Sequence, residues 1–147
     1  MNWVAITVDD LKAVAFGGII DAAQAAAVGA NDPVAEAVAD AVAVVRGAIS
    51  AGNVLDADAS KVPRSLRSLT ARAAVFALME RVQMELSVDQ RATRQADGLR
   101  LQRIGEQRQR FERADVPAGS GEMQPGPGGE TVVPGNRGHS REELRGI

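Results

Sequence analysis

The sequence predicts an all-α protein: a small helical bundle of two short N-terminal helices and three longer ones, followed by an extended, irregular C-terminal arm. Helix-start signals recur along the chain, and apolar residues repeat at spacings of three and four. In contrast, 8 of the 15 glycines and 4 of the 6 prolines fall in the last 31 residues. Since 147 residues suit one core, we assign a helical domain to residues 1–116 and a Gly/Pro-rich arm to residues 117–147.

Two short helices are expected near the N-terminus. Thr7 and Asp10 have the spacing of a capping box, in which each side chain satisfies a free backbone N–H, so a helix is predicted over residues 8–15. A glycine pair then interrupts it, because glycine disfavours helix. The alanine-rich residues 19–28, followed by another glycine, are predicted to form the second helix.

Two longer helices follow. Asp32 before Pro33 is a strong start signal and predicts a helix to about residue 50. Its apolar stripe consists of Val38, Val42, Val45 and Ile49. Pro63 is expected to open the next helix, to about residue 86, at the centre of the bundle. That helix carries the apolar stripe Leu66, Leu69, Ala73, Phe76 and Met79.

A second capping box, from Ser87 to Gln90, predicts a last helix over about residues 88–113. Four of its arginines can share part of one face and are possible DNA- or partner-facing residues: Arg100, Arg103, Arg110 and Arg113. Acidic residues are interleaved with them, and Glu106 with Arg110 forms a favourable i,i+4 pair. The face can therefore be solvated and salt-bridged, bound to a partner protein, or in contact with DNA.

The residue supply for catalysis is poor, and we predict that the protein is not an enzyme and uses no cofactor or metal. The chain lacks cysteine, and its sole histidine, His139, falls in the Gly/Pro-rich arm. Asp56 and Asp58 lack the further ligands of a calcium loop and are interpreted as solvated loop residues. The glycines at 126–129 are not followed by the Lys-Ser/Thr pair of a phosphate-binding loop.

Charge is divided unevenly along the chain. The net charge is −6 over residues 1–60, +5 over residues 61–116 and −1 over residues 117–147. This division favours head-to-tail contact between copies, or contact with an oppositely charged partner. Pairing of helices within one subunit is the alternative.

Three motifs occur in a recognisable order. The first comprises Thr7, Asp10 and Leu11; the second Ala41, Val45, Arg46 and Ile49; the third Val62, Pro63 and Leu66. With an arginine-bearing last helix, this order resembles the head-to-tail connector (adaptor, or head-completion) proteins of tailed bacteriophages. The resemblance covers about residues 3–106.

The resemblance implies a structural virion protein of the phage neck, assembled in the host cytoplasm, with no membrane contact. It implies a homo-oligomeric ring, dodecameric by analogy, that binds beneath the portal protein and extends the DNA channel toward the tail. Its partners would be the portal, the next neck or tail protein and, non-specifically, channel DNA. The alternatives are a DNA-binding phage packaging or regulatory protein that uses the last helix, and a helical scaffold unrelated to virions.

The arm carries the predicted partner-binding residues. The β-prone run Thr131, Val132 and Val133 could add a strand to a neighbour, and Leu144 and Ile147 could fix the end of the chain. The alternative is an unstructured tail.

Overall fold

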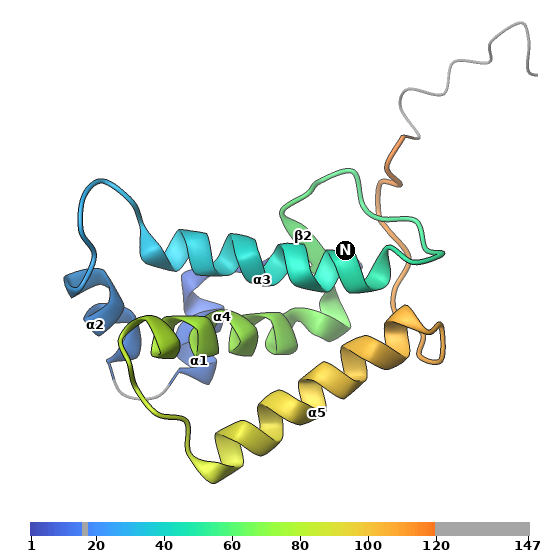
Figure 1. Ribbon diagram of the computed structural model, residues 1–147. Coiled ribbons are helices and arrows are strands. Elements are labelled where there is room, and N and C mark those ends of the chain that lie inside the picture. The colour runs from blue at the N-terminus through green and yellow to red at the C-terminus, as the bar shows by residue number, and fades with distance from the viewer. Residues whose placement is uncertain (16–17, 120–147) are drawn as a thin grey trace, which may run out of the picture.

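The computed structural model describes residues 1–15 and 18–119, and in them the predicted all-α class is confirmed (Figure 1). Five α-helices make up most of this part of the chain, accompanied by a small two-stranded sheet and one short 3₁₀ helix. The helices are α1 (Val8–Val14), α2 (Ile19–Ala25), α3 (Pro33–Ile49), α4 (Arg67–Arg81) and α5 (Val88–Gly105).

Three of the helix starts, those of α1, α3 and α5, follow the local signals in the sequence. The capping boxes at Thr7 and Ser87 both form, and the Asp32 carboxylate accepts the N–H groups of Val34 and Ala35 at the start of α3. Three helices end several residues earlier than expected: α2 at residue 25 rather than 28, α4 at residue 81 rather than 86, and α5 at residue 105 rather than about 113.

Helix α4 lies at the centre, as predicted, and packs against α1, α2, α3 and α5. Figure 1 shows it between α3 and α5. One apolar cluster joins α1, α2 and the start of α3 to α4, with Leu11, Ile19 and Leu78 fully buried. A second cluster surrounds the start of α4 and the end of α3, with Trp3, Ile49 and Ile104 fully buried. Burial of such large side chains is the main stabilising contribution.

The sheet was not expected from the sequence. Strand β1 (Trp3–Ala5) pairs antiparallel with β2 (Lys61–Pro63), with Trp3 opposite Pro63. Pro63 therefore ends a strand instead of opening a helix, and a 3₁₀ helix (Arg64–Leu66) leads into α4. The prediction failed because strands of three residues are too short to show an alternating pattern.

The last helix was predicted too long. Helix α5 ends at Gly105, where an added Cβ would lie 3.2 Å from the carbonyl oxygen of Ala48 in α3. Gln107 then has a positive φ of 59°, which turns the chain away from the helix. Residues 106–119, which we call the strap, run from there across the N-terminal strand and the loop between α3 and β2.

Candidate partner interface at the strap

The four candidate arginines do not share one helix face. Arg100 and Arg103 lie on α5, whereas Arg110 and Arg113 lie on the strap. The predicted partner-binding residues of the arm lie outside the described residues: Thr131, Val132, Val133, Leu144 and Ile147. The candidate interface within the described residues is therefore the strap, which positions Arg110 and Arg113 and continues into the arm.

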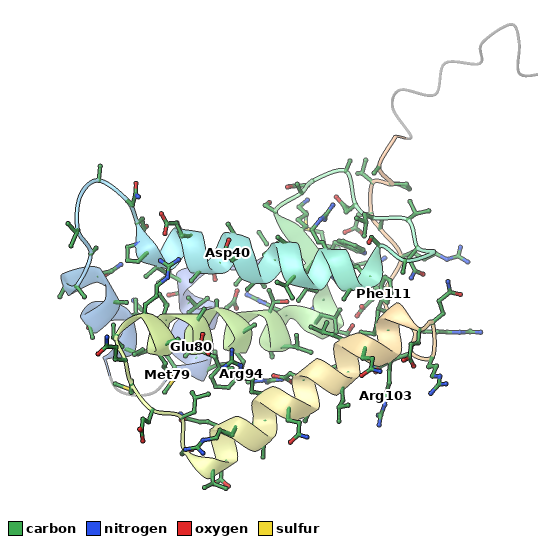
Figure 2. All side chains as sticks on the ribbon, in the orientation of Figure 1. Asp40, Met79, Glu80, Arg94, Arg103 and Phe111 are labelled. Atoms are coloured by element: carbon green, nitrogen blue, oxygen red, sulfur yellow. The ribbon has the colours of Figure 1, made fainter. Side chains whose placement is uncertain are left out.

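The arginines differ in their surroundings. Arg100 is half-buried and donates a hydrogen bond to the carbonyl oxygen of Ser65, 3.2 Å away, so it joins α5 to the start of α4. Arg103 is exposed, and Figure 2 shows it on the outer side of α5. Arg110 and Arg113 are also exposed. The predicted pair of Glu106 with Arg110 is wrong, because Glu106 contacts Arg108 instead, at 3.3 Å.

An open cavity of about 820 Å³ lies between the strap and the turn after α3. Arg110 and Arg113 line it from the strap, together with Phe111, and Val54 lines it from the turn. Two arginines, the acidic Glu112 and apolar surface therefore line the same cavity.

The N-terminal strand holds one side of the strap. The Asp115 carboxylate accepts the backbone N–H groups of Asn2 and Trp3 at 2.9 Å each. The indole N–H of Trp3 donates to the carbonyl oxygen of Glu112 at 3.0 Å, and Phe111 packs edge-on against the indole with ring centroids 6.5 Å apart. Trp3 thus contacts the strap through its backbone and its ring.

A buried carboxylate holds the other side. Asp56 is 1% exposed, and its side chain accepts the backbone N–H groups of Asp58, Asp115 and Val116 at 3.0 to 3.1 Å. The interpretation of Asp56 as a solvated loop residue is therefore wrong, although Asp58 is exposed. Two backbone hydrogen bonds extend the contact, from Ala57 to Val116 and from Ala118 to residue 55. The first residues of the predicted arm are thus tied to the helical body.

Arg46 supports the loop that carries Asp56. Its guanidinium donates to the carbonyl oxygens of Asp56 and Lys61 at 2.7 Å and of Asp58 at 3.0 Å. It also lies over the Trp3 ring, 5.5 Å from the centroid. The sequence analysis named Arg46 only as part of the second motif and predicted none of these contacts. The signal that could have found it is an arginine on the otherwise apolar C-terminal half of α3.

Hydrogen bonding sets the pKa values of the two carboxylates. Burial raises the pKa of Asp56, but the N–H groups of Asp58, Val116 and Asp115 more than offset it, so the pKa lies below the ordinary 3.8. The N–H groups of Asn2 and Trp3 lower the pKa of Asp115. Both carboxylates are therefore charged at neutral pH and available as acceptors.

This arrangement is suited to binding and positioning. Among residues 1–15 and 18–119, no group of three or more His, Asp or Glu side chains could hold a metal ion. None of the helices in that part of the chain is long and apolar enough to cross a membrane. His139 and the glycines at 126–129 lie outside the described residues.

Comparisons with known protein families, with curated proteins and with solved structures found no match.

Proposed function

We propose that this chain is a subunit of a head-to-tail connector ring of a tailed bacteriophage, which binds beneath the portal and extends the DNA channel. In this proposal the protein has a structural role in the virion neck. The C-terminal arm contacts an adjacent ring, and the strap fixes the point from which the arm leaves the helical body.

The observation that best supports this proposal is that residues of the second and third motifs pack together in the folded chain. Val45 and Ile49 of the second motif and Val62 and Leu66 of the third are buried in the same cluster, around Trp3. Arg46 of the second motif donates to the carbonyl oxygen beside the third, at Lys61. The second and third motifs therefore belong to one packing unit, as expected if these motifs characterise a common fold.

The first motif is joined to the same unit through α4. Asp10 closes the cap of α1 and also forms an ion pair with Arg67, whose guanidinium nitrogen lies 2.6 Å from the carboxylate. Leu11 is fully buried against α4. Each of the three motifs thus contributes a contact that holds the helices together, which supports the family resemblance as the basis of the proposal.

A binding experiment with the portal tests the proposal. The full chain is mixed with purified portal rings from the same genome and followed by sedimentation and electron microscopy. We expect a ring of added density on one face of the portal. A chain that remains monomeric and does not bind the portal at any ratio overturns the proposal.

A further inference from the structure

The outer face of α5 carries a row of exposed apolar side chains that the rest of the described chain leaves uncovered. Val88 is 79% exposed and Leu99 is 48% exposed, and Ala92 lies exposed between them in the same row, which also includes the exposed Gln95. The opposite face of α5 is fixed, because Ile104 is fully buried and Arg72 of α4 makes two hydrogen bonds to Asp97. These contacts determine which face of α5 points away from the other described helices.

A groove of about 710 Å³ runs along α3, and we call it the α3 groove. One wall is the flank of α3 that carries alanine and valine at helical spacing, and the other is formed by β1, the start of α1 and the loop before β2. Its lining is mostly apolar and includes Ile6, Val8, Ala35, Val38, Ala39 and Ala43. Small side chains on the α3 wall allow another helix to approach closely.

The two surfaces match in length. Asp89 and Arg103 on α5 are 14 positions apart, as are Asp32 and Arg46 at the ends of the α3 groove. At 1.5 Å per residue each distance is roughly 21 Å along the helix. A helix can therefore lie along the groove with one charged residue near each end.

The charges at the ends also match, in one orientation. The groove has Asp32 at one end and Arg46 at the other. On α5, Asp89 stands in the first turn and Arg103 in the last. An antiparallel arrangement brings Arg103 toward Asp32 and Asp89 toward Arg46, and it also opposes the two helix dipoles.

We propose that the outer face of α5 docks antiparallel into the α3 groove of a second copy of this chain. This inference deepens the connector proposal and rests on it, because a ring requires two different surfaces of each subunit to meet. Such a contact is heterologous, since each copy gives α5 to one neighbour and its groove to the other, and it closes into a ring or continues as a chain.

Site-directed disulfide formation tests the contact, because the chain contains no cysteine of its own. Leu99→Cys and Ala35→Cys proteins are mixed, oxidised and separated without reductant, at concentrations up to about 1 mM to reach weak association. We expect a linked pair in the mixture and a ladder of linked copies for the double variant. Val28→Cys replaces Ala35→Cys in the control, since Val28 is 94% exposed and lies outside the groove.

Three results would overturn the contact. The first is a mixture that links no more than the Val28→Cys control, and the second is preferential linking of Leu99→Cys to itself. The third is preferential linking of Leu99→Cys to Ala43→Cys, which would reverse the helix orientation. In addition, Leu99→Asp should weaken self-association about tenfold while Val28→Asp leaves it unchanged.

The disulfide and portal-binding experiments together distinguish failure of this inference from failure of the connector proposal. A ladder of linked copies without portal binding leaves the contact in place and refutes the connector. Ring density on the portal without the link between residues 35 and 99 supports the connector and overturns the contact.

Discussion

The carboxylate of Asp115 accepts the backbone N–H of Trp3 at 2.9 Å, although 112 positions separate the two residues in the chain. This bond ties the first strand to the last described segment and makes the strap part of the fold. Since the strap includes the first residues of the arm, the same bond helps to fix the position of residues 117–119 relative to the helices. The hydrogen bonds that hold the strap, and the surfaces around them, can be tested by substitution and truncation.

Asp56→Asn should release the strap. One oxygen of Asp56 accepts the N–H groups of Asp115 and Val116 while the other accepts that of Asp58, and an amide can replace only one of them. The loss should be about 1–3 kcal/mol in the free energy of unfolding. Urea denaturation and faster hydrogen exchange over residues 106–119 measure it.

Asp58→Asn is the matched control, because Asp58 lies in the same loop but is exposed, and its carboxylate contacts Ser60 and Lys61 rather than the strap. It should leave exchange in the strap unchanged. Equal effects of the two substitutions would contradict the role given to Asp56.

Acid should open the strap before it disrupts the bundle. Because Asp56 and Asp115 have pKa values lowered below 3.8 in the folded chain, they stabilise it fully above that pH. Their contribution is lost as the pH falls through the lower folded values. The fluorescence of Trp3, which is the sole tryptophan and contacts the strap, should change at a higher pH than the helical circular dichroism. Coincident transitions would contradict separate opening.

Asp97→Ala should loosen the N-terminal half of α5. Arg72 makes two hydrogen bonds to Asp97, at 2.7 and 2.8 Å, and both side chains are less than a third exposed. Removal of the carboxylate should cost about 1–2 kcal/mol and speed hydrogen exchange over residues 88–98.

Glu80→Ala provides the comparison for that change. Glu80 pairs with Arg94 between the same two helices, as Figure 2 shows, but both side chains are about half exposed. Its loss should cost less than about 0.5 kcal/mol. A larger effect at Glu80 than at Asp97 would show that burial does not decide the strength of these pairs.

Truncations before and after Asp115 should have different effects on the melting temperature. A chain ending at Gly119 retains every described strap bond and should keep its melting temperature and helix content, while its incorporation into portal assemblies falls. A chain ending at Ala114 lacks Asp115 and Val116 and should melt at a lower temperature. Unchanged assembly by the first truncation would make the arm dispensable.

Replacing the three exposed arginines distinguishes the connector from the DNA-binding alternative. We expect the triple variant Arg103→Ala, Arg110→Ala and Arg113→Ala to fold and to join portal rings. Loss of strongly salt-dependent DNA affinity, without any change in portal binding, would favour the alternative. Arg100 is left in place in this variant because it bonds to Ser65.

Features set by neighbouring residues could be predicted from the sequence. The capping boxes at Thr7 and Ser87 and the Asp32 start depend on side chains three positions away or fewer, and all three form. The central position of α4 also followed from its apolar pattern. The charge division and the motif order gave a functional hypothesis, whereas the geometry of the interface could not be obtained in this way.

The failures share a physical cause, which is contact between distant segments. Asp56 was assigned to solvent because the strap that buries it comes 59 and 60 positions later. Phe111 falls within the predicted helix over residues 88–113, but it lies in the strap and packs on Trp3. The contacts of Arg46 could not be predicted either, since they depend on the fold of the loop that follows, whose carbonyl groups lie 10 to 15 positions later in the chain.

The meeting of the two ends of the described chain also sets the order in which the protein can fold. On synthesis, the first strand is complete long before Asp115 and its neighbours emerge, so its outer N–H groups wait for their acceptor. Joining segments more than a hundred positions apart carries a larger loop-closure entropy than forming any of the helices. We therefore expect the helices to assemble first and the strap to be seated after them.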